Sequence, residues 1–341
     1  MKNILFNCYS ASDLNDNIFK KDRIWLSSGK STIQKDDKNQ GFLHFARVLN
    51  ENNYNIHTQD LWNKKDKIDL QINFAYHQKI ICDKSYLLLP ESVEIYDQNN
   101  LNILKNNYTK IFCQYDDFID NTKIFKNNYP FIIKKKFDQD INSRTLLSAM
   151  ICSNKSQKKK SKKDLYFKRF EIIDFMEKYE NSFKLYGMDW NLPFKRSGNI
   201  GRIINFLNKI FRIKSKLKNY KGVIKDKSDI LKETKFSFCI ENNSINGYIS
   251  DPIFDSFSNG CIPIYLGAPN VNKYIPENTF IDLRRFDNIS SLFTHINSMS
   301  EKKIEEFQLN IYKFINSDKI KYFNEEKFAN IIINHLKEDL R

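Results

Sequence analysis

Hydrophobic residues in the first half of the chain form short continuous runs that alternate with helical spacing. The runs NILFNCY (residues 3–9) and YLLL (86–89), the second closed by Pro90, are typical of buried parallel strands. Between them, GFLHFARVLNENN (41–53) repeats apolar residues every three or four positions, which predicts a helix. Strand and helix in alternation predict an α/β domain with a mostly parallel sheet.

The second half of the chain repeats this alternation. LLSAMICSN (146–154) predicts a strand, and DLYFKRFEIIDFMEKYE (164–180) predicts a helix. A basic segment follows at 198–221, which we interpret as an irregular insertion whose role the sequence leaves open. We therefore expect two Rossmann-like domains, 1–145 and 146–341. The last helix belongs to the second domain or packs back on the first.

Composition narrows the function classes. The chain has 341 residues, 41% of them hydrophobic, and a formal net charge of +14, so it can bury a large core and favours an anionic partner. Most aromatic residues occupy core-like positions, so we expect no nucleic-acid partner. No apolar run approaches the roughly 18 residues of a membrane span. We expect a cytoplasmic protein, either free or peripheral on the inner membrane face.

Polar residues that follow predicted strands are candidate ligand contacts, because ligands of open α/β sheets bind beyond the carboxyl ends of strands. Glu241 and Asn242 follow KFSFCI, and Glu91 follows the run closed by Pro90. A carboxylate at the end of a buried strand, such as Glu91, suits general-base chemistry if it is partly desolvated. For each of these acids, an exposed loop position is the competing interpretation.

The stretch GYISDPIF (247–254) predicts the start of a helix. Ser250 can cap it, Asp251 favours the positive end of the helix dipole, and Pro252 suits the first helical position. The same features fit either capping alone or a site where Asp251 binds a ribose and free amides face a diphosphate. Arg169, on the helix after the lysine run, could likewise bind phosphate or simply be solvated.

We predict no metal site. The five histidines and six cysteines show no zinc-ligand spacing. The DQD at 138–140 imitates the DxD motif of metal-dependent glycosyltransferases, but no convincing apolar strand precedes it.

A longer block resembles a known family. KFSFCIENNSINGYISDPIFDSFSNGCIPIYLG (235–267) is similar to the signature of the α-1,3/4-fucosyltransferases, glycosyltransferase family 10, of bacterial type. ICSNK, FKLYGMDWN and YLLLPES extend the resemblance on both sides. The resemblance implies a GT-B fold, with two Rossmann-like domains facing across a cleft. It also implies inverting, metal-independent transfer of L-fucose from GDP-fucose to a hydroxyl of a glycan or lipopolysaccharide, expected to be O3 of GlcNAc or Glc.

The resemblance also implies roles for individual residues. Glu91 would be the general base on the acceptor hydroxyl, and Asp251 would stand where the family binds the ribose. The remaining donor contacts would be Arg169 on the diphosphate, with Asn154, Glu241, Asn242, Tyr248 and Ser250 around it. No cofactor beyond the donor substrate is implied.

The signature differs from the family at the donor site. Asp251 replaces a glutamate, and Pro252 replaces the family lysine that meets the phosphates. Two alternatives therefore stay open: a relative that uses a different nucleotide sugar, and a catalytically silent glycan- or nucleic-acid-binding protein.

Overall fold

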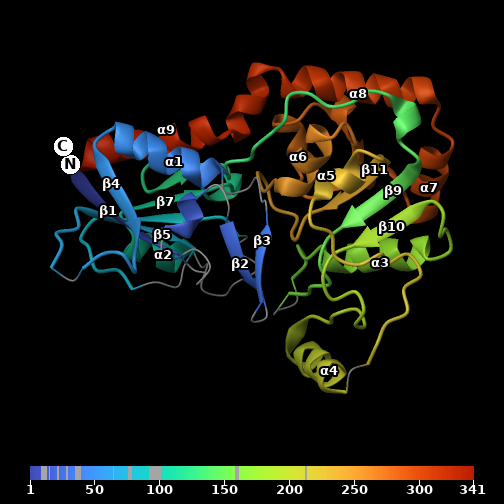
Figure 1. The fold of residues 1–341 in the computed structure, drawn as a ribbon, viewed down its shortest axis with the longest axis horizontal. Helices are drawn as coiled ribbons and strands as arrows, with labels where there is room; N and C mark the ends of the chain where they lie inside the picture. Colours follow the sequence, from blue (N-terminus) through green and yellow to red (C-terminus); the bar gives the residue numbers. More distant parts are fainter. Residues whose placement is uncertain are drawn as a thin grey trace. The chain divides into compact units, whose positions relative to one another are not determined.

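The computed structural model covers residues 1–341 and describes all of them except 9–13, 15, 21–22, 28–29, 35–39, 64, 76–78, 92–100, 158–160 and 212. The chain forms two compact units (Figure 1). Unit 1 comprises residues 1–132 and 320–341, and unit 2 comprises residues 133–319.

Unit 1 is built on a six-stranded parallel sheet. Its order is β4-β1-β5-β6-β7-β8, with bounds Tyr54–Thr58, Lys2–Asn7, Leu70–Phe74, Ser85–Leu89, Lys110–Cys113 and Ile124–Lys126. Its helices are α1 (Gln40–Glu51), α2 (Leu101–Asn107) and α9 (Glu325–Asp339). An antiparallel hairpin of β2 (Arg23–Ser27) and β3 (Lys30–Gln34), which the sequence analysis missed, stands apart from this sheet.

The C-terminal helix completes the core of unit 1. Figure 1 shows α9 beside α1, and the ring of Phe328 on α9 meets Phe42 and Phe45 of α1, with centroids 5.7 and 5.5 Å apart. Ile332 and Leu336, one and two turns further on, are fully buried in the same core. The hydrophobic stripe of α9 thus covers a face that the first 132 residues leave open.

Unit 2 is built on a five-stranded parallel sheet of order β10-β9-β11-β12-β13. These strands span Phe183–Tyr186, Leu146–Ile151, Thr234–Ile240, Ile262–Leu266 and Ile281–Asp282. Helices α3 and α6 cover opposite faces of it (Figure 1). The helices are α3 (Tyr166–Met176), α4 (Gly198–Ile210), α5 (Lys227–Leu231), α6 (Asp251–Ser258), α7 (Ile289–Asn297) and α8 (Glu301–Ile315).

In both sheets the order in which successive strands are added reverses at the same point. In each, the second parallel strand lies outside the first and the third lies on its inner side, a 2-1-3-4-5 order. This is the flavodoxin-like form of the doubly wound fold, so the predicted α/β class is confirmed.

The segment before β9 is fixed to unit 2 by Arg144. Its buried guanidinium donates to the carbonyl oxygens of Leu231, Thr234, Asp138 and Asn259 at 2.7–3.1 Å. These bonds hold the chain ahead of the expected boundary at 145/146 within unit 2, and the division seen in the structure lies at 132/133.

The first part of the basic insertion is a helix where we expected irregular chain. Residues 198–210 form α4, although few of its side chains are buried. In the described residues, no helix is both long and apolar enough to cross a bilayer.

Replacing Leu336 by Ala should lower the free energy of unfolding by about 2–5 kcal/mol, because the change leaves a cavity between α9 and α1. Urea unfolding followed by circular dichroism would measure the loss. Lys337→Ala, one residue along on the exposed face of α9, is the control and should change it by less than about 0.5 kcal/mol. Equal effects of the two changes would contradict this packing of α9.

Candidate functional site

In the sheet of unit 2, the strand order reverses between β9 and β11, which are neighbouring parallel strands. Asn154 follows β9, and Glu241 and Asn242 follow β11, so their main chains leave the sheet at its carboxyl edge. Doubly wound sheets bind ligands at this edge, beside the reversal point.

A buried carboxylate connects β11 to the start of α6. Glu241 is 2% exposed, and its Oε1 accepts a hydrogen bond from the Ser250 amide at 2.7 Å. The Ser250 hydroxyl donates to the other carboxylate oxygen. Ser250 does stand at the N-cap of α6, but its side chain makes no capping hydrogen bond. The predicted capping role is therefore wrong, because the hydroxyl is bonded to Glu241.

Gly267, the residue directly after β12, makes room for this carboxylate. A β-carbon on Gly267 would lie 2.4 Å from Cγ of Glu241 and 2.3 Å from the hydroxyl oxygen of Tyr265. The Glu241 amide meanwhile donates to the carbonyl of Leu266 at 2.8 Å. Burial raises the pKa of the Glu241 carboxyl to about 7, against opposition from the hydrogen bonds of Ser250.

Arg169 reaches from α3 to the same strand end. Its Nε and Nη2 donate to the carbonyl of Ile240, and Nη2 also donates to Oδ1 of Asn242 at 3.0 Å. The Asn242 amide in turn donates to the Tyr248 hydroxyl at 3.5 Å. Nη1 of Arg169 makes no hydrogen bond to any residue that the structure describes, so one edge of a buried cation stays available for a ligand.

Asp251 is paired with a lysine that the sequence analysis did not identify. Nζ of Lys227, on α5, lies 2.7 Å from Oδ2 of Asp251 and 2.5 Å from Oδ2 of Asp255. Burial opposes the charge on Lys227, but the two carboxylates outweigh it and raise the pKa of the ammonium group. The only sequence signal for this residue is its place shortly after the basic insertion.

Asn154 has a structural role in this conformation. Its Nδ2 donates to the carbonyls of Asp189, Leu192 and Pro193, and its Oδ1 accepts from the Lys195 amide. These bonds fix the loop after β10, and its predicted contact with the donor stays a prediction.

Glu91 lies in unit 1, directly after β6. The hydroxyl of Tyr115 donates to the Glu91 carbonyl, and Nε2 of Gln114 lies 3.4 Å from the carbonyl of Pro90. These bonds fix the backbone that carries the carboxylate. The residues that follow, 92–100, lie outside the described part of the chain.

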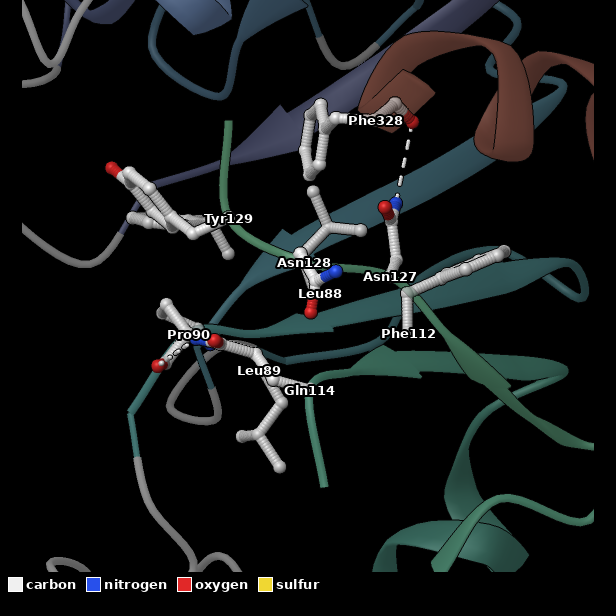
Figure 2. A pocket seen from close by; sticks show the side chains of 10 residues that line it. Leu88, Leu89, Pro90, Phe112, Gln114, Asn127, Asn128, Tyr129 and Phe328 are labelled. Carbon is white, nitrogen blue, oxygen red and sulfur yellow. Dashed lines mark hydrogen bonds between the residues drawn. The ribbon is translucent and has the colours of Figure 1, made fainter. Parts of the chain in front are cut away.

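A pocket opens beside Pro90 at the carboxyl edge of the unit 1 sheet (Figure 2). Aromatic, aliphatic and amide side chains line it: Phe74, Leu88, Leu89, Pro90, Phe112, Gln114, Asn127, Asn128, Tyr129 and Phe328. The amide oxygens of Gln114, Asn127 and Asn128 are buried without a hydrogen-bond partner among the described residues. Each can accept a hydrogen bond from a hydroxyl group or water.

Within the described residues, no cluster of three His, Cys, Asp or Glu side chains could hold a metal ion. Asp138 and Asp140 of the DQD segment accept backbone amides of Asp140 and Asn142, respectively, and so stabilise a turn.

Comparison with known proteins places these residues in a family context. The family described as "Glycosyltransferase family 10 (fucosyltransferase) C-term" matches residues 142–325, which is more than half of the chain. An α-(1,3)-fucosyltransferase of Helicobacter pylori is 31% identical over 80 residues, 24% of this chain and 17% of that protein. An α-(1,4)-fucosyltransferase of Arabidopsis thaliana is 29% identical over 70 residues, 20% of this chain and 18% of that protein. The aligned stretches thus span under a fifth of these relatives.

Solved structures share the fold over nearly the whole chain. A crystal structure of an α1,3-fucosyltransferase with GDP-fucose has a TM-score of 0.55 at 13% identity and covers 98% of this chain and 90% of its own. The Anabaena protein HepE in complex with UDP reaches 0.55 at 10% identity, covering 99% and 100%. The predicted GT-B fold is therefore confirmed.

The Glu241 carboxyl should make the stability of the protein depend on pH. Its pKa is about 7 in the folded chain and near 4.5 ordinarily, so the folded state binds more protons between these values. Its contribution to the free energy of unfolding is therefore full below about pH 4.5 and lost as pH rises to about 7, by on the order of 3 kcal/mol at most.

Glu241→Gln cannot titrate and should remove this loss. Urea unfolding of both proteins from pH 4.5 to 8 measures the difference. Parallel curves for the two proteins would contradict the raised pKa.

Proposed function

Because the chain belongs to glycosyltransferase family 10, the fucosyltransferases, we propose that it transfers L-fucose from GDP-fucose to a hydroxyl of a glycan or glycolipid. The observation that carries the proposal is the cluster at the carboxyl edge of β11. There Arg169, Glu241, Asn242 and Tyr248 are joined by hydrogen bonds and packing to the start of α6, inside the matched residues. This cluster would form the donor site of an α-1,3-fucosyltransferase-like enzyme.

The leaving group needs stabilisation by positive charge. Negative charge develops on the diphosphate as the bond to the fucose anomeric carbon breaks, so preorganised donors near it lower the barrier. Arg169 would offer Nη1, and the first turn of α6 would offer amide groups. Both are held before the donor arrives, which reduces the cost of ordering them in the reaction.

Lys227 would replace the lysine that the family has at position 252. Its ammonium group lies 2.7 Å from the carboxylate of Asp251, the residue directly before Pro252. It therefore brings a cation from α5 to the first turn of α6. It would also orient Asp251, whose carboxylate would bind the ribose hydroxyls.

Glu91 would act as the general base. Its carboxylate would take the proton of the acceptor hydroxyl, and the oxygen would attack the anomeric carbon opposite GDP, with inversion and without a required metal. The acceptor would bind in unit 1 close to Glu91, next to the pocket beside Pro90, whose three amide oxygens have no hydrogen-bond partner among the described residues. Lipopolysaccharide is the acceptor class that we favour, given the net charge of +14, and the cytoplasm is the location we propose.

A second candidate is transfer from a different nucleotide sugar. Pro252 favours it, because the family contact to the phosphates is missing at that position. A thermal-shift panel of GDP-, UDP- and CMP-sugars separates the two. Stabilisation by GDP-fucose above the others supports fucose transfer. Tight, salt-sensitive binding to nucleic acid with no response to any sugar nucleotide would instead indicate a silent binding protein.

Glu91→Gln should lower the rate of transfer at least 10²-fold, because the amide cannot accept the acceptor proton. Radiolabelled GDP-fucose with N-acetyllactosamine-type and lipopolysaccharide acceptors measures transfer, and calorimetry measures GDP binding, which should stay unchanged. Asp117→Asn is the matched control, an exposed carboxylate of the same unit that should retain activity. Full activity of Glu91→Gln would rule out its role as base, and loss of activity with EDTA would contradict the metal-free mechanism.

Replacing Lys227 should weaken GDP binding about tenfold or more, because a charge-assisted contact to phosphate is lost. The variant Lys227→Met with Asp255→Asn keeps the net charge of the cluster, so extra carboxylate repulsion cannot explain the loss. Adding Pro252→Lys to it should restore binding.

The control for this series is Lys225→Met, an exposed lysine next to α5. Calorimetric titration with GDP measures all four proteins. Wild-type affinity in the double variant would show that Lys227 only pairs with the two aspartates. An affinity loss that Pro252→Lys does not repair would show that orientation of Asp251, and not phosphate charge, is the role of Lys227.

A further inference from the structure

Helix α4 is amphipathic, but it is its polar face, and not its apolar face, that contacts the rest of unit 2. Gly201 is buried against the loop before the helix, where a β-carbon would lie 2.6 Å from the Arg196 carbonyl. Asn205, one turn on, bonds to the amide and carbonyl of Arg196 at 2.9 Å each. These contacts hold the helix by its polar side.

The opposite face of α4 is apolar and uncovered in the described structure. Its large side chains recur at three- and four-residue spacing and continue just past the helix end. Their exposed fractions are 76% at Ile200, 61% at Ile203, 63% at Phe206, 41% at Leu207, 54% at Ile210 and 70% at Phe211. Figure 1 shows α4 standing away from the sheet of unit 2. A contiguous exposed apolar stripe of this kind marks an interaction site.

The segment that contains α4 carries mainly positive charge, and Asp189 just before it pairs with Lys195 at 2.6 Å. Residues 190–225 contain ten Lys and Arg residues and no Asp or Glu. Arg202 and Lys209 are exposed on α4 itself, flanking the apolar stripe. The end of the insertion returns to the unit through Glu177, whose carboxylate accepts the amides of Lys218 and Asn219 at 2.6 and 3.2 Å. The cationic segment is thus anchored at both ends.

We propose that α4 docks this protein on an anionic lipid bilayer. A helix of 13 residues is about 20 Å long, which suits a helix lying in the interface and is too short to cross the roughly 30 Å hydrocarbon core. Apolar side chains enter the boundary between headgroups and acyl chains, while flanking lysines and arginines contact lipid phosphates.

Charge distinguishes this occupant from the others. A second copy of the chain would bring two cationic segments together, and each would repel the other at low ionic strength. Nucleic acid would satisfy the cations but leave Ile200, Ile203 and Ile210 exposed, because phosphate and sugar bury little aliphatic surface. Of these three occupants, the anionic bilayer is the one that accepts the apolar stripe and its charged border together. The inference does not depend on the donor or the proposed reaction.

Co-sedimentation with vesicles tests the proposal, using the full chain without nucleotide. We expect binding to phosphatidylglycerol-containing vesicles and at least tenfold weaker binding to pure phosphatidylcholine. Arg202→Gln with Lys209→Gln should weaken binding about 20-fold or more, since each charge near the surface contributes about fivefold. Ile203→Ser with Phe206→Ser should also weaken it at least tenfold.

Matched controls lie elsewhere in the chain. Lys302→Gln with Lys313→Gln removes the same charge from exposed positions of α8, and Ile81→Ser with Leu309→Ser removes two exposed apolar side chains. Both should bind vesicles like the wild type. If the control variants lost as much vesicle binding as the α4 variants, net charge or general hydrophobicity would explain the binding, and the proposal would be overturned.

A probe in the helix tests insertion directly. The tryptophan fluorescence of the Phe206→Trp variant should shift to shorter wavelength on phosphatidylglycerol vesicles, because the indole leaves water. Two results would overturn the proposal: no shift at saturating lipid, or sedimentation-detected self-association that the apolar variants abolish while vesicle binding is absent. GDP titration of the same variants should be unchanged, so a failed donor site and a failed membrane site are distinguishable.

Discussion

The site in unit 2 depends on the hydrogen bonds between the Glu241 carboxylate and Ser250. They join the end of β11 to the first residues of α6, so the helix begins at a fixed place relative to the sheet. A carboxylate in a buried position is expensive to ionise, which the raised pKa of Glu241 expresses. The fold retains this group because its two acceptors satisfy both the amide and the hydroxyl of the turn.

Arg169 depends on the same arrangement. Its guanidinium spans the Ile240 carbonyl and the Asn242 side chain, immediately beside Glu241 in the sequence. Among the described residues its guanidinium donates to no carboxylate, which is unusual for a buried cation. Backbone and amide oxygens bind its Nε and Nη2, and the charges of Glu241 and Asp164 interact with it without a direct ion pair, so Nη1 is the edge that can meet an anionic ligand. Glu241 therefore fixes the turn, and Arg169 gives the turn its charge.

The sequence predicted most of this architecture and the residues on the strand ends, because burial leaves a local imprint on the chain. Runs such as YLLL and KFSFCI are apolar since both faces of a parallel strand are covered. Long-range bonds leave no such imprint. The pattern around Ser250 fits an N-cap, and only the structure shows that its hydroxyl is bonded to Glu241, nine residues earlier. Lys227 is 24 residues from Asp251, with no local signal for their pairing. Helix α4 has helical spacing, but its apolar face is not buried, so reasoning from core formation missed it.

The two differences from the family signature at the start of α6, Asp251 and Pro252, can be explained together when Lys227 is considered with them. A lysine at position 252, directly after Asp251, would add a second cation near the Lys227 ammonium, which already pairs with Asp251 and Asp255. Proline avoids this repulsion and suits the first turn of the helix, where its missing amide leaves no hydrogen bond unmade. The Asp251 carboxylate, shorter than a glutamate by one methylene, lies 2.7 Å from the ammonium group of Lys227 on α5. The three residues therefore form one arrangement, in which the cation comes from a neighbouring helix and α6 is left free to begin with proline.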